Sequence, residues 1–160
     1  MKKVNLAKMY AYVFTQIETI DDVGKAKTPY LNVSVFDHWL NEKEADDCDI
    51  LAYKIAVNRG RENAYLSGEQ QFLQLYRKLG EGGIVINVPG PLREIYNNCS
   101  EVDEIFKNSL REKKLMDVFF PIYSVRVLGG YDRTDLFVLH DWKKYTQLIN
   151  IVEEVGLYAI

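Results

Sequence analysis

The chain has 160 residues, of which 48% are hydrophobic and 27% charged, a balance typical of one globular domain and not of a disordered chain. Its net charge of −3 disfavours a nucleic-acid-binding role, because proteins that bind phosphate backbones are usually basic. No stretch approaches the roughly 18 apolar residues of a membrane span, and the N-terminus lacks the apolar core of a signal peptide. We therefore expect one cytoplasmic domain covering residues 1–160.

The two cysteines, Cys48 and Cys99, do not form a CxxC pair. A chain of this length buries enough apolar surface to fold without a disulfide or a structural metal, which favours a reducing compartment. Cys48 lies among aspartates, which oppose formation of a reactive thiolate. We expect no cofactor and no cysteine chemistry.

The first 60 residues predict a helix, a strand and an ambiguous segment. Apolar residues recur every three or four positions over residues 6–20, after Asn5 as a potential N-cap, which indicates an amphipathic helix. Apolar and polar residues alternate over 30–36, as in a half-buried strand. Residues 50–57 fit both periodicities, and we favour a helix.

The middle of the chain predicts a second clear helix and a buried strand. The helix covers residues 67–79, with Ser67 and Gln70 as a capping box at its start and Gly80 at its end. The continuous apolar run over 84–88 predicts a short buried strand.

The last third predicts a helix, a hairpin and a final helix. One helix begins at Ser100, and two strands follow over 119–128 and 135–140 with a turn at 129–132. Asp141 is positioned to cap the last helix, and the apolar tail after Gly156 could add a strand. Helices and strands interspersed in this order predict an α+β domain whose mixed sheet, including the C-terminal-half hairpin, packs against amphipathic helices.

Two short segments resemble each other. Residues 35–39 read Val-Phe-Asp-His-Trp and residues 138–142 read Val-Leu-His-Asp-Trp, and each follows a predicted strand. If those strands are parallel neighbours, both His–Asp pairs lie at the carboxyl edge of the sheet, where ligands often bind. The alternative function is therefore a small metal-dependent enzyme or ligand-binding domain. Its site would consist of Asp37, His38, His140 and Asp141.

A packing interpretation of the same two segments is favoured. In it, Asp37 and Asp141 are helix N-caps, and Trp39 and Trp142 pack the first turn of each helix onto the sheet. The sequence also lacks a Gly-x-Ser-x-Gly nucleophile elbow and any Cys-His spacing typical of zinc. We therefore expect no catalytic site.

The leading interpretation is a non-catalytic module that binds another protein. An acidic stretch can steer the chain onto a basic partner, and the eleven tyrosines are more than the predicted core needs. Small cytoplasmic inhibitors and immunity-type proteins block their partners in this way. The expected contact residues are Glu42, Glu44, Asp46, Asp47, Asp49 and Tyr131.

Overall fold

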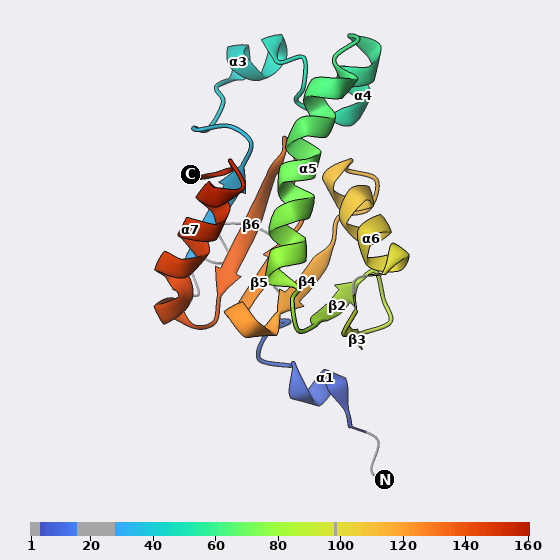
Figure 1. Ribbon diagram of the computed structural model, residues 1–160, viewed down its shortest axis with the longest axis vertical. Coiled ribbons are helices and arrows are strands. Elements are labelled where there is room, and N and C mark those ends of the chain that lie inside the picture. Colours follow the sequence, from blue (N-terminus) through green and yellow to red (C-terminus); the bar gives the residue numbers. More distant parts are fainter. Residues whose placement is uncertain (1–3, 16–27, 98) are drawn as a thin grey trace.

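The computed structural model describes residues 4–15, 28–97 and 99–160. Figure 1 shows one sheet whose front face is covered by the three long helices. The strands, in order across the sheet, are β3 (Arg93–Ile95), β2 (Ile84–Val88), β4 (Asp117–Phe120), β5 (Val125–Leu128), β6 (Thr134–Leu139), β1 (Tyr30–Ser34) and β7 (Tyr158–Ala159). The helices are α1 (Leu6–Met9), α3 (Glu42–Asp47), α4 (Tyr53–Asn58), α5 (Glu62–Leu79), α6 (Ser100–Leu110) and α7 (Tyr145–Glu154). The predicted α+β class is confirmed.

Every strand pair in the sheet is antiparallel, so the predicted mixed sheet was wrong. The reason lies in where the helical connections return. Helix α6 joins β3 to β4, which run in the same direction, but β2 lies between them. Helix α7 likewise joins β6 to β7 with β1 between them. Helical connections normally indicate parallel neighbours, and here an inserted strand separates each such pair.

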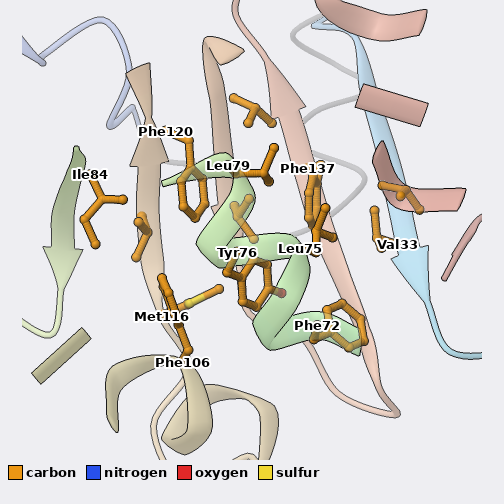
Figure 2. Close-up of a cluster of buried hydrophobic side chains, with 14 of the residues drawn as sticks. Val33, Phe72, Leu75, Tyr76, Leu79, Ile84, Phe106, Met116, Phe120 and Phe137 are labelled. Carbon is orange, nitrogen blue, oxygen red and sulfur yellow. The ribbon is translucent and has the colours of Figure 1, made fainter. Parts of the chain in front are cut away.

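The main core lies between the sheet and α5, α6 and α7, and Figure 2 shows Tyr76 of α5 at its centre. The Tyr76 ring lies 5.0 Å from that of Phe106 and 6.1 Å from that of Phe120, measured between ring centroids. Its hydroxyl donates a hydrogen bond to the buried carboxylate of Asp135, which also accepts from the Gly130 amide at 2.8 Å. A polar pair in an aromatic core is tolerated because its donors and acceptors are satisfied.

The Asp135 carboxyl predicts a specific pH dependence of stability. Burial raises its pKa from 3.8 to about 6, against the lowering effect of the hydrogen bonds from Tyr76 and Gly130. Between these values the folded chain binds more protons than the unfolded chain, so the free energy of unfolding falls as the pH rises from 4 to 6. The difference amounts to about 3 kcal/mol.

Urea unfolding between pH 4 and 7 should therefore show a smaller fall for Asp135→Asn than for the wild type. His140, whose pKa burial lowers, has the opposite effect in this window, but it is present in both proteins. Parallel pH profiles for the two proteins would contradict the role given to Asp135.

Helix α5 begins at Glu62, five residues before the predicted capping box, so the predicted start at Ser67 was wrong. Its first turns are stabilised by packing, since Tyr65 is buried. Gly68 has a packing role in these turns. A Cβ atom there would lie 2.3 Å from the Nη2 atom of Arg133, so glycine leaves room for the buried guanidinium.

Other predicted boundaries are corrected by the structure. The predicted strand 119–128 is two strands, because Pro121 begins a 3-10 turn and Ser124 is left-handed with a φ of 48°. In the ambiguous segment 50–57, residues 53–57 belong to α4, so the favoured helix is confirmed for that part. The short strand β3 was not predicted, and α3 begins at Glu42 after Asn41, not after Asp37 as the packing interpretation expected. The C-terminal tail adds β7 to the sheet, as the sequence suggested.

The N-terminal segment lies on the opposite face of the sheet from the long helices. Asn5 caps α1, as predicted, and the side chains of Tyr10 and Val13 pack against the sheet. The predicted first helix ends at Met9, and its expected continuation over residues 16–20 lies outside the described residues. No helix in the described parts of the chain is long and apolar enough to cross a membrane.

A buried ion pair holds this segment against the sheet. The Arg126 guanidinium donates to both carboxylate oxygens of Asp117, at 2.7 and 2.9 Å. Its Nη1 atom donates to the carbonyl oxygens of Val13, at 3.1 Å, and Thr15, at 2.7 Å. Arg126 is 3% exposed, so these bonds replace water that it has lost.

Replacing Arg126 by methionine should lower the free energy of unfolding by about 3–5 kcal/mol, because Asp117 is left buried without its partner. The double variant Asp117→Leu/Arg126→Met should recover most of this loss. Arg77→Met, which breaks the half-exposed pair with Asp103, is the control and should cost below about 1 kcal/mol. If urea unfolding showed equal losses of stability for Arg126→Met and Arg77→Met, the role given to the Asp117–Arg126 pair would be contradicted.

Candidate functional site

The predicted acidic stretch forms part of a protruding loop. Residues 35–52, which we call the α3 loop, connect β1 to α4 and carry α3 beyond the end of the sheet (Figure 1). Asn41 and Glu44 form a capping box, with the Asn41 side chain accepting from the Glu44 amide at 2.9 Å and the Glu44 side chain from the Asn41 amide at 2.8 Å. This Asn-x-x-Glu spacing was the sequence signal that predicts α3 and that the sequence analysis missed.

His38 links the start of the α3 loop to the helix. Its Nδ1 atom lies 2.6 Å from an Asp37 oxygen and its Nε2 atom 3.2 Å from a Glu44 oxygen. The hydrogen bond to Asp37, followed by that to Glu44, raises the pKa of His38 above its ordinary value. The protonated ring can donate to both carboxylates at once, so His38 stabilises the loop.

A buried guanidinium fixes the base of the α3 loop. Arg133 is 6% exposed and stacks over the Tyr65 ring, 4.0 Å from the ring centroid. Its Nη2 atom donates to the Tyr65 carbonyl oxygen at 2.7 Å and its Nη1 atom to the Ile50 carbonyl oxygen at 3.4 Å. The Arg133 side chain therefore joins the start of β6 to helix α5 and to the end of the α3 loop.

A second arginine holds the neighbouring helix α4. Arg111 forms a bidentate pair with the buried Glu69 at 2.6 and 2.8 Å, and its guanidinium lies 4.2 Å from the centroid of the Tyr53 ring. Tyr53 begins α4, so the pair connects this helix to α5 and α6. Arg133 and Arg111 together hold the α3 loop and α4 in place. This surface would therefore lose little conformational entropy on binding a partner.

The structure brings Tyr131 to the α3 loop. A cavity of about 90 Å³ lies between this loop and the β5–β6 turn, and its walls include Phe36, Ala45 and Tyr131. Tyr131 is 64% exposed, and Trp39 on the same cavity is 59% exposed. Trp39 was expected to pack on the sheet, and its exposure corrects that expectation. Two large aromatic side chains therefore stand beside the acidic helix.

All five acidic residues of the predicted site are exposed, but they differ in their contacts. Glu44 takes part in the capping box, and Asp49 pairs with Arg59 at 2.8 Å. The other three form no ion pair with any described residue: Glu42, Asp46 and Asp47. Asp46 and Asp47 end α3, where the helix dipole disfavours negative charge.

The structure does not bring the two His–Asp pairs together. Strands β1 and β6 are neighbours, but they are antiparallel, so His38 and His140 follow opposite ends of the strand pair. His140 contacts the Tyr12 ring edge-on, its Nε2 atom has no partner in the described structure, and burial lowers its pKa. The described residues contain no group of three or more side chains arranged to hold a metal ion.

The residues beside the two histidines were expected to cap helices and to pack on the sheet, and the structure corrects these expectations. Asp141 was expected to cap the last helix, but it caps the 3-10 turn Trp142–Lys144 by accepting from the Lys143 amide at 3.0 Å. The N-cap of α7 itself is Lys144, which makes no side-chain cap hydrogen bond. Asp37 caps no helix, because Asn41 holds that position in α3. Trp142 is 69% exposed, so it does not pack on the sheet as expected.

A larger cavity, of about 440 Å³, lies over the Asp117–Arg126 pair. Asn87 on its wall donates to Asp117 at 2.7 Å. Because the charge of Asp117 is already compensated by Arg126, this cluster is explained by its role in holding the N-terminal segment.

Comparisons of the chain with protein families, with curated proteins and with solved structures found no match.

The charges at the end of α3 predict a gain in stability on neutralisation. Asp46→Asn together with Asp47→Asn should raise the free energy of unfolding by about 0.5–1 kcal/mol, because both charges oppose the helix dipole. Glu42→Gln, at the start of α3, is the matched control and should lower it by a few tenths of a kcal/mol, about 0.3. Urea unfolding and amide exchange in α3 measure both effects. If both variants changed the free energy of unfolding in the same direction, the role given to the helix dipole would be contradicted.

Proposed function

We propose that this protein acts without catalysis, by docking the α3 loop and Tyr131 onto a basic surface of another protein. The observation that carries the proposal is that two exposed aromatic rings, Trp39 and Tyr131, line one cavity beside α3, whose carboxylates are exposed. Such a module is of the same kind as small inhibitors and immunity-type proteins, which block the surface that they cover.

The residue types on the α3 loop support this proposal. Exposed carboxylates accelerate the encounter with a positively charged partner and select against acidic ones. Tryptophan and tyrosine are the side chains that most often carry binding energy at protein interfaces. Trp39 and Tyr131 would supply the buried anchors, and the acidic residues would form the charged rim.

Two acidic residues of α3 lower the stability of the helix that carries them. Asp46 and Asp47 lie where negative charge destabilises a helix, and they form no ion pair with the described residues that would offset this. Binding residues are often retained at a cost in stability, because function depends on them. A basic partner would supply the missing counter-charges.

The test compares baits that carry the same net charge. The site variant combines Glu42→Gln, Asp46→Asn and Asp47→Asn, and leaves the structural residues Glu44 and Asp49 intact. The control variant changes three exposed glutamates on other surfaces: Glu81→Gln, Glu104→Gln and Glu153→Gln. Wild type and control should retain the same stoichiometric partner from an extract of the source cell, and the site variant should lose it.

With the purified partner, the site variant should associate about 10- to 100-fold more slowly at low salt, and this difference should shrink as salt is added. Trp39→Ala or Tyr131→Ala should instead accelerate dissociation by tenfold or more, an order-of-magnitude estimate for an interface anchor. Equal association rates for the site and control variants would refute the proposal.

A further inference from the structure

A third cavity is lined by residues of β3 and of the N-terminal segment. These two parts of the chain lie at the other end of the molecule from the α3 loop (Figure 1). The volume of the cavity is about 140 Å³, and its walls include Tyr10, Glu94 and Tyr96. The Tyr10 hydroxyl donates to one Glu94 oxygen at 2.6 Å and the Tyr96 hydroxyl to the other at 2.8 Å. A half-buried carboxylate is thus held between two tyrosines.

The glutamate is the charged group of this pocket. No lysine, arginine or histidine of the described structure forms an ion pair with Glu94. Burial and the Glu94 carboxylate raise the pKa of Tyr10, and the hydrogen bond to Glu94 raises that of Tyr96, so both hydroxyls stay protonated. The two hydroxyl bonds use about half of the acceptor positions of a carboxylate, which leaves acceptor capacity for a cationic donor.

Aromatic rings and alkyl groups form most of the remaining walls of the pocket. The Tyr10 ring is 8% exposed and packs on Phe119, 6.1 Å away between ring centroids. The Tyr96 ring lies against the backbone of Gly83, where a Cβ atom would come within 3.0 Å of it. Pro121 completes one wall. Aromatic rings and alkyl groups around one carboxylate suit the soft, weakly hydrated surface of an organic cation.

We propose that this pocket binds the head group of one monovalent organic cation, such as an alkylated or primary ammonium group, with Glu94 as its counter-ion and Tyr96 as its ring contact. The volume limits the ligand to a head group, because pockets for whole drug-sized molecules are larger, about 300–1,000 Å³. A single carboxylate is too few ligands for a divalent metal. This inference is independent of the docking role of the α3 loop.

Titration of the 15N-labelled protein with tetramethylammonium chloride tests the proposal, with sodium chloride at equal ionic strength as the reference. The amide signals of Gly82, Gly83, Glu94 and Tyr96 should shift and saturate, with a dissociation constant on the order of 1 mM for so small a ligand. Linear shifts that sodium chloride reproduces would overturn it.

Variants identify the groups responsible. Glu94→Gln removes the charge at nearly constant volume and should weaken binding at least about tenfold. Tyr96→Leu removes the ring from an exposed position, where folding does not depend on it, and should weaken binding about three- to tenfold. Glu81→Gln, a neighbouring exposed acid outside the pocket, is the matched control and should bind as the wild type does. Unchanged affinity in Glu94→Gln would reject the pocket.

The source of the cation follows from two further probes that carry the same primary ammonium group. If Nα-acetyl-lysine N-methylamide binds about tenfold more tightly than n-butylammonium, the pocket accepts a lysine side chain of a polypeptide, since the extra contacts come from the backbone. If the two bind equally, it accepts a free amine. If neither of these two ligands nor tetramethylammonium bound, the cation site would be rejected.

Discussion

The buried guanidinium of Arg133 is the contact on which the proposed docking surface depends. Burying a charge is costly unless polar groups replace the lost water. Here the replacements are two carbonyl oxygens, of Tyr65 and Ile50, and the face of the Tyr65 ring. Each comes from an element that must be in place before the guanidinium can be buried. Gly68 completes the arrangement, because any side chain there would occupy the space of the guanidinium.

Much of the secondary structure could be predicted, because apolar periodicity reports burial directly. The stripe on α5 that contains Phe72 and Tyr76 identified a core helix, although its first turns were missed. Those turns depend on Tyr65 and Gly68, whose partners are distant in sequence. The antiparallel direction of the strands was not predicted. A third strand lies between each two strands that a helix connects, and the local hydrophobic pattern does not reveal this insertion.

The candidate site was only partly predictable for the same reason. The acidic residues of α3 and the exposed Tyr131 stood out by residue type, but their proximity depends on the β5–β6 turn meeting the α3 loop. The two His–Asp pairs resemble each other in sequence, but β1 and β6 are antiparallel, so the pairs lie at opposite ends of these two strands. Glu94 gave no signal in sequence, because Tyr10 reaches it across 84 positions.

Strand β1 pairs with β6 and β7, so its partners lie 100 or more residues later in the chain. During synthesis, the α3 loop leaves the ribosome attached to a strand that has no neighbour. Tyr131 and Arg133 follow only with the β5–β6 hairpin, long after the α3 loop. Contacts between distant segments form late in folding. The surface that we assign to docking is therefore completed only after the β5–β6 hairpin has been made, and a chain that stops before this hairpin would lack the surface.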